Sequence, residues 1–192
     1  MNACHRIVLV RHGETHWSAT RRHTGRSDIT LGDEGKAAAA GLAEALRGWD
    51  FALALSSPLS RAWDTAQLAG LDPIADDDLL EWDYGVYEGR TTDEIRTEIP
   101  GWSVWTHEVV GGESLEAVGA RADRAIERAS RAGGDAVLVA HAHLLRILTA
   151  RWIGLPPGHG RHFTLDTATV SVLGWERDTR AIHAWNVSGY GG

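Results

Sequence analysis

The sequence predicts an α/β fold: a three-layer α/β/α sandwich with helices on both faces of a mostly parallel central sheet. Short β-branched apolar runs, RIVLV at residues 6–10 and AVLVA at residues 136–140, are typical of buried strands. Alanine-rich segments with helix start and stop signals lie between the apolar runs. Strands that alternate with helices favour a layered sheet, and 192 residues without a linker-like stretch indicate a single domain over residues 1–192.

Local signals indicate each element in turn. Segment 33–47 has acidic residues in its first turn and Gly48 as a stop signal, which is typical of a helix. Pro58, in a Ser-Ser-Pro turn that can cap, begins a second helix at 59–68. The other expected helices lie at 92–98, at 113–132 with Ser114 or Gly112 as a cap, and at 143–153. The other expected strands lie at 51–55, from residue 74, at 168–175 and at 181–187.

Composition excludes several classes of function. A formal net charge of −7 argues against an extended nucleic-acid surface, because such surfaces neutralise phosphates with many Lys and Arg side chains. No apolar run approaches the roughly 20 residues that cross a bilayer, and the apolar run 7–10 is too short for a signal peptide. Cys4 is the only cysteine, which fits a reducing compartment. We therefore expect a soluble, cytoplasmic protein with no membrane partner.

The strand ends carry the residues with catalytic chemistry. In open α/β sheets, ligands bind beyond the carboxyl ends of the strands. One expected strand runs through Arg11 into His12, another ends at His141, and a third ends at Ser56 before a helix that carries Arg61 in its first turn. If these strands are neighbours, two imidazoles and two guanidinium groups meet at one rim. Such a pocket suits a tetrahedral anion.

The segment Arg11-His12-Gly13-Glu14 has a matching chemical logic. Gly13 allows a sharp turn and a close approach of phosphate to the backbone. Arg11 can bind two oxygens at once, and the neutral ring of His12 can act as a nucleophile. Neighbouring guanidinium groups disfavour the imidazolium form. The charges that bind the substrate therefore also keep His12 reactive.

These residues belong to an ordered set that resembles the histidine phosphatase superfamily, also called the phosphoglycerate mutase-like family. The likeness spans nearly the whole chain, and the glutamate-tryptophan signature at 81–85 is similar to the small acid-phosphatase branch. The set comprises Arg11 to Thr15, Thr24-Gly25, Ser56 to Pro58 with Arg61 and Thr65-Ala66, Glu81 with Tyr84-Gly85, Glu88-Gly89, and Ala140-His141 before Arg146.

The resemblance implies a phosphoryl group carried on His12. It implies that Arg11, Arg61 and His141 hold the phosphoryl oxygens, and that Glu81 protonates the leaving oxygen and then activates water. Because that glutamate must start protonated, we expect better activity below neutral pH. The resemblance further implies five residues near the substrate: Ser18, Thr24, Gly25, Tyr84 and Ala142. Other acids in the same motif regions remain candidates for the proton donor: Glu14, Asp83 and Glu88.

Departures from the family pattern favour a phosphatase. Family members that isomerise phosphoglycerate have a longer insert with cations for the substrate carboxylate, whereas segment 101–112 has no basic residue except His107. A phosphoglycerate mutase-type transferase and a sugar bisphosphatase remain alternatives. Ala142 and His143 follow His141 where the family often has glycine. Trp17, Trp82, Trp102 and Trp105 are candidates for the wall of an organic-phosphate pocket, although core packing is the commoner role of tryptophan.

Neither a metal nor a cofactor is expected. His141 and His143 have a spacing that some metal sites use, but no matching acid cluster appears, and residues 76–78 are interpreted as a solvated turn. A metal-dependent phosphatase and a catalytically silent binding module are therefore weaker alternatives. The expected partners are a small phosphate ester and inorganic phosphate. A homodimer is also considered, because exposed tryptophans would mark a dimer face.

Overall fold

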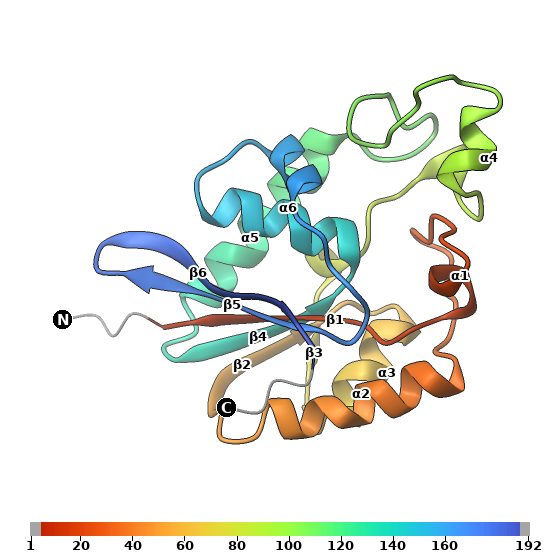
Figure 1. Cartoon of the computed structure of the whole chain (residues 1–192). Coiled ribbons are helices and arrows are strands. Elements are labelled where there is room, and N and C mark those ends of the chain that lie inside the picture. Colours follow the sequence, from red (N-terminus) through yellow and green to blue (C-terminus); the bar gives the residue numbers. More distant parts are fainter. Residues whose placement is uncertain (1–4, 189–192) are drawn as a thin grey trace.

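A six-stranded sheet forms the centre of the molecule in the computed structural model, which describes residues 5–188 (Figure 1). The strand order is β3-β2-β4-β1-β5-β6. The strands are β1 (Ile7–Arg11), β2 (Phe51–Ser56), β3 (Ile74–Ala75), β4 (Asp135–Ala140), β5 (Val170–Glu176) and β6 (Thr179–Val187). The helices are α1 (His16–Ala19), α2 (Asp33–Ala45), α3 (Ser60–Leu68), α4 (Thr92–Arg96), α5 (Leu115–Ser130) and α6 (Ala142–Trp152). Three short 3-10 helices are η1 (Asp77–Leu79), η2 (Gly85–Tyr87) and η3 (Pro157–His162).

Both faces of the sheet are buried. Ile7 and Leu9 of β1 pack in one cluster with residues of α5 and α6, whereas Val8 and Val10 pack in a second cluster with residues of α2 and α3. Successive side chains of a strand point to opposite faces, so an unbroken apolar run such as IVLV covers both. Helices α5 and α6 accordingly lie above the sheet in Figure 1, with α2 and α3 below it. The predicted three-layer fold is confirmed.

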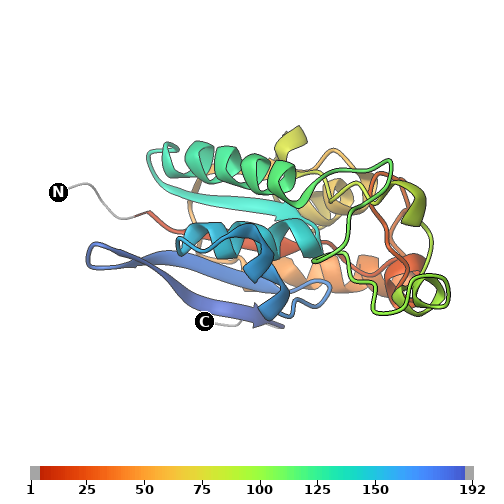
Figure 2. The ribbon, with the colours of Figure 1, turned by 90° about the horizontal axis from the view of Figure 1, so that it is seen from above.

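The carboxyl ends of three parallel strands lie level at one edge. Strand β4 pairs with β1, where Arg11 is opposite Ala140, and with β2, where Ser56 is opposite Val139. The backbone N–H of His12 then donates to the carbonyl of Ala140 at 3.0 Å. Seen from above, α1, α4 and their connecting loops gather beyond this edge (Figure 2). The expectation that these strands are neighbours is therefore confirmed.

Several local expectations need correction. Ser57 does not cap α3 in the expected way: Asp28 accepts hydrogen bonds from the backbone N–H of Ser60 at 2.9 Å and from its hydroxyl at 2.8 Å. The acids at 76–78 do not form a solvated turn, because Asp76 and Asp78 pair with arginines of α5. The closing strands β5 and β6 are antiparallel to their neighbours. Ser114 does cap α5, as one of the two expected alternatives.

Three further features of the described residues bear on the expectations. The nine tryptophans all lie in the described residues, and each is buried or half-buried, so the exposed tryptophans on which the homodimer expectation rested are not found. The homodimer itself stays a prediction. No helix between residues 5 and 188 is both long enough and apolar enough to cross a membrane. Cys4 lies outside the described residues.

Gly13 and Gly35 allow two backbones to touch. A Cβ atom on Gly13 would lie 2.3 Å from the carbonyl oxygen of Gly35, and a Cβ on Gly35 would lie 2.0 Å from the carbonyl oxygen of Glu14. Neither glycine has a positive φ. The loop after β1 therefore packs directly on the first turn of α2. Contact with α2 is a structural reason for Gly13 that the expected role in phosphate approach did not include.

We predict opposite effects for alanine at two glycines of α2. Gly35→Ala forces a Cβ into the backbone of Glu14, and overpacking of this kind costs about 1–3 kcal/mol or more. Gly41→Ala, which meets nothing within 4 Å, should stabilise the helix by about 0.5–1 kcal/mol. Urea denaturation of both variants checks the pair. Equal stabilities would contradict the backbone contact.

Candidate active site

A cavity of about 320 Å³ lies beyond the carboxyl ends of β1 and β4. Its walls come from the strand ends, from the loop around α1, from the segment before η2 and from the start of α6. Residues predicted for the site and now found in its lining are Arg11, His12, Ser18, Thr24, Glu81, Tyr84 and Ala142. Lining residues that the sequence did not single out for the site are Arg21, Arg22, His23, His143 and Asp166.

The ring of His12 is held in one tautomer. Its Nδ1 atom lies 2.7 Å from the carbonyl oxygen of Gly13. A carbonyl only accepts hydrogen bonds, so Nδ1 carries the proton in the neutral ring. The lone pair is then on Nε2. His12 is 5% exposed, so this lone pair lies in a nearly dry site, where a neutral imidazole is able to act as a nucleophile.

Burial and charge keep His12 neutral. Burial is the largest cause that lowers the pKa of His12 well below 6.5, and the charges of Arg11 and Arg61 lower it further. The sequence predicted the effect of the arginines but not the larger effect of burial. The neutral, nucleophilic ring therefore persists below neutral pH.

His141 and Arg61 lie together beneath the cavity, and both are 0% exposed. The rings of His12 and His141 are 5.1 Å apart between centroids. Arg61 donates from Nε to Nδ1 of His141 at 3.2 Å, which leaves Nε2 of His141 to donate to the Ser57 hydroxyl at 2.8 Å. Burial first, and then the charge of Arg61, lowers the pKa of His141 well below 6.5. The second histidine is therefore also neutral.

Arg61 also fixes the loop that carries Thr24 and Gly25. Its terminal nitrogens donate to the carbonyls of Thr24 at 3.1 Å, Gly25 at 2.9 Å and Ser27 at 2.9 Å. From the other side, Glu88 accepts from the backbone N–H of Ser27 at 2.9 Å. Gly25 is behind the cavity wall rather than in its lining. Direct contact of Arg61 and Gly25 with substrate stays a prediction.

Arg11 is a half-buried cation with spare donor capacity. One terminal nitrogen donates to the carbonyl of Leu165, while the buried Nε has no partner among the described residues. Burial is the largest cause that lowers the pKa of Arg11, and the charges of Glu81 and Asp166 oppose it. A guanidinium group in this state gains strongly from an incoming anion, because a buried unpaired donor is costly.

Glu81 lies at the N-terminus of α6. Its Oε1 accepts from the backbone N–H of Trp82 at 2.9 Å and of Leu144 at 3.0 Å, and its Oε2 accepts from that of His143 at 3.1 Å. Two of these donors, from His143 and Leu144, are N–H groups of the first turn of α6 that have no partner within the helix. Since Oε2 has a single partner among the described residues, it keeps a lone pair for proton transfer.

A neutral aromatic wall lines the cavity near Glu81. The hydroxyl of Tyr84 is 2.6 Å from Nδ1 of His143, and the ring of His23 lies 4.9 Å from that of Tyr84. Burial lowers the pKa of His23 to about 4, and burial followed by the charge of Arg146 lowers that of His143 well below 6.5. Burial raises the pKa of Tyr84 well above 10. The wall can donate and accept hydrogen bonds without carrying charge.

The remaining candidates lie elsewhere. None of the four tryptophans considered for a substrate pocket lines this cavity; Trp82 and Trp105 line a neighbouring hollow, and Trp82 and Trp102 are core residues. Within residues 5–188, no group of three or more His, Cys, Asp or Glu side chains is arranged to hold a metal ion. The missed residues lie in irregular segments, apart from His143, whose only sequence signal was its spacing from His141.

Comparison with known proteins places this geometry in a family. A model of the histidine phosphatase superfamily (branch 1) matches residues 7–188. The chain is 41% identical to the acid phosphatase of Mycobacterium tuberculosis, over 97% of this chain and 94% of that protein. The solved structure of M. tuberculosis Rv3214 has a TM-score of 0.92 and 39% identity, covering 96% of this chain and 98% of the other.

Two more distant relatives carry other names. Sedoheptulose 1,7-bisphosphatase of Saccharomyces cerevisiae is 31% identical over 78% of this chain and 68% of its own. The Probable phosphoglycerate mutase GpmB of Salmonella paratyphi A is 31% identical over 94% of this chain and 90% of its own. The chain belongs to the histidine phosphatase superfamily. Within it, this protein is an enzyme of the phosphatase type.

The neutral histidines predict a loss of stability in mild acid. Unfolding returns their pKa values to about 6.5, so below that pH the unfolded chain binds more protons than the folded one. The stabilisation is therefore complete above pH 6.5 and is lost as the pH falls. His12 and His141 together should contribute about 2–3 kcal/mol to the fall in the free energy of unfolding between pH 7.5 and 5.5, and His23 and His143 add to that fall. Urea denaturation at both pH values measures this.

Two variants separate this effect from other titrations. His183→Gln changes an exposed histidine and should leave the pH dependence unchanged. His141→Gln removes a buried titrating group and should make the dependence shallower. A free energy of unfolding that stays constant from pH 7.5 to 5.5 would contradict neutral burial of the two rings.

Proposed function

We propose that the protein hydrolyses small organic phosphate monoesters through a phosphohistidine on His12, without a metal or cofactor. The observation that supports this most directly is the hydrogen bond from Nδ1 of His12 to Gly13, which directs the lone pair to Nε2. The buried, partly unsatisfied guanidinium group of Arg11 beside it supports a phosphoryl group as the electrophile.

In the first half-reaction, Nε2 of His12 attacks phosphorus and the bond from phosphorus to the ester oxygen breaks. Glu81 gives its proton to that oxygen, so the product leaves as a neutral alcohol. Arg11, with Arg61 and His141 behind it, stabilises charge on the equatorial oxygens. In the second half-reaction, Glu81 takes a proton from water as the water attacks phosphorus. Inorganic phosphate leaves, and His12 regains its lone pair.

Glu81 is the preferred proton donor because the other acids are occupied or remote. Glu88 holds the backbone around Ser27, and Asp83 accepts from the backbone N–H of Gly85 at 2.9 Å. Glu14, Asp83 and Glu88 are absent from the cavity lining. Asp166 also lines the cavity, and one of its oxygens accepts from the side-chain amide of Asn186 at 2.8 Å. The family resemblance, which assigns the proton donor to Glu81, favours Glu81 over Asp166.

The wall of the cavity supports hydrolysis of esters with a neutral organic group. His23, Tyr84 and His143 offer hydrogen bonds without charge, which suits hydroxyl groups of a sugar or polyol better than a carboxylate. Arg22, the cation next to this wall, already pairs with Glu94 at 3.2 Å. The exposed Arg21 at the cavity is the feature that favours the bisphosphatase alternative, because it could meet a second phosphate.

The test is phosphate release from a panel of esters with excess EDTA. Release should survive EDTA, and His12→Ala should lower kcat/KM by about a thousandfold or more, as expected for removal of a nucleophile. His183→Ala, an exposed control, should match the unaltered protein. Brief reaction with ³²P-labelled ester should label the protein but not the His12 variant.

Other outcomes would select an alternative. Release abolished by EDTA would contradict the metal-independent mechanism. Phosphoryl transfer between phosphoglycerates without net phosphate release would favour the mutase. A bisphosphate hydrolysed far better than its monophosphate, with the preference lost in Arg21→Gln, would favour the bisphosphatase.

A further inference from the structure

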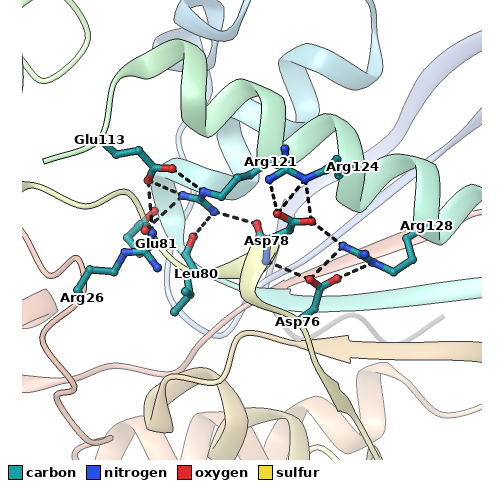
Figure 3. Close-up of polar contacts among 9 residues, drawn as sticks. All are labelled: Arg26, Asp76, Asp78, Leu80, Glu81, Glu113, Arg121, Arg124 and Arg128. Atoms are coloured by element: carbon teal, nitrogen blue, oxygen red, sulfur yellow. Dashed lines mark hydrogen bonds and ion pairs between the residues drawn. The ribbon is translucent and has the colours of Figure 1, made fainter.

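We propose that Arg121 is a positioning residue that holds the segment carrying Glu81 in place for proton transfer. This inference rests on the proposed role of Glu81 as proton donor. Arg121 lies on α5, outside the cavity lining, and it reaches Glu81 through the main chain (Figure 3).

Arg121 is anchored by a nearly buried ion pair. Its Nε lies 2.6 Å from Oε1 of Glu113 and its Nη2 lies 2.8 Å from Oε2, with 10% and 15% of the two side chains exposed. Two parallel bonds fix the plane of the guanidinium group. The remaining donors therefore point in a defined direction.

Those donors meet the chain directly before and at Glu81. Nη1 donates to the carbonyls of Asp78 and Leu80, both at 2.9 Å, and Nη2 approaches the carbonyl of Glu81 at 3.5 Å. The short helix η1 ends at Leu79, so these carbonyls do not accept hydrogen bonds from the backbone of a continuing helix or of a strand. Arg121 supplies the missing hydrogen-bond donors.

Glu113 fixes the chain on the other side of Glu81. Its carbonyl accepts from the indole N–H of Trp82 at 2.7 Å, and its backbone N–H donates to the carbonyl of Asp83 at 3.0 Å. Arg121 and Glu113 thus bind the segments before and after Glu81. Since misplacement by about 1 Å can cost on the order of a hundredfold in rate, this binding bears on catalysis.

Helix α5 also supplies a matched control. Arg124 pairs with the carboxylate of Asp78 at 2.6 Å, but its side chain is 55% exposed and it contacts no carbonyl of the segment (Figure 3). Replacing Arg124 removes a salt bridge near the same segment. It leaves the hydrogen bonds from Arg121 to the carbonyls of the segment that carries Glu81 in place.

The test compares esters that differ in their need for a proton. An alkyl phosphate releases a strongly basic alkoxide and needs the acid, whereas p-nitrophenyl phosphate releases a stable phenolate and needs it little. kcat/KM reports the first half-reaction for both. Glu81→Gln, as the reference, should lose about a hundredfold or more with the alkyl ester and far less with the aryl ester.

Arg121→Met should show the same selective loss, about tenfold or more with the alkyl ester and less than about threefold with the aryl ester. Arg124→Met should change neither ester by more than about twofold. Adding Arg121→Met to Glu81→Gln should cause no further loss with the alkyl ester. If Arg121→Met does not fold, Arg121→Lys decides the test, because an ammonium group keeps the ion pair but cannot reach all the carbonyls.

Two outcomes overturn the inference in distinguishable ways. In the first outcome, Glu81→Gln loses activity selectively with the alkyl ester, but the Arg121 variants lose activity equally with both esters or not at all. This result would support Glu81 as the proton donor and reject its positioning by Arg121. An equal loss on both esters in Glu81→Gln would reject the proton donor itself, and the inference with it.

Discussion

The in-register pairing of β1 with β4 is the constraint on which the rest of the site depends. With Arg11 opposite Ala140, the residue that follows each strand is a histidine, and the two rings lie 5.1 Å apart. Both strands are buried on both faces, so the rings have no route to water through the sheet. The two histidines are therefore placed by the paired strands of a sheet, which are more rigid than a loop.

Burial of this cluster has an electrostatic cost that the site resolves. Two guanidinium groups and two histidines share a small volume, and four positive charges could not remain there. The imidazoles give up their protons, and Glu81, when it is ionised, offsets part of the remaining charge of Arg11 and Arg61. The site still holds more positive than negative charge in its depth. In the proposed function a dianionic phosphoryl group completes that balance, so that binding and reactivity come from the same residues.

The sequence predicted the parts of the site that depend on local pattern. The strand ends at His12 and His141 followed from apolar runs, and the carboxyl-end rule brought them together. What the sequence did not predict depends on contacts between distant segments. The structural role of Gly13 depends on its contact with Gly35, and Asp76 is paired by an arginine of α5. The guanidinium group of Arg61 donates to carbonyls of a loop that has no regular sequence pattern. His23 and Asp166 enter the cavity from similar irregular segments, so no periodicity marked them.

The residue after His12 is held by a contact of main chain with main chain, between Gly13 and Gly35, whereas the cavity near Glu81 is lined by side chains. At Gly13 main chain meets main chain, so a side chain added there, as in Gly35→Ala, strains the loop that follows His12. The wall near Glu81 is made of side chains, among them His23 and His143, which can be exchanged for larger or smaller ones without moving His12. Redesign toward a different ester would therefore start from that wall, and the reactive half could be carried over unchanged.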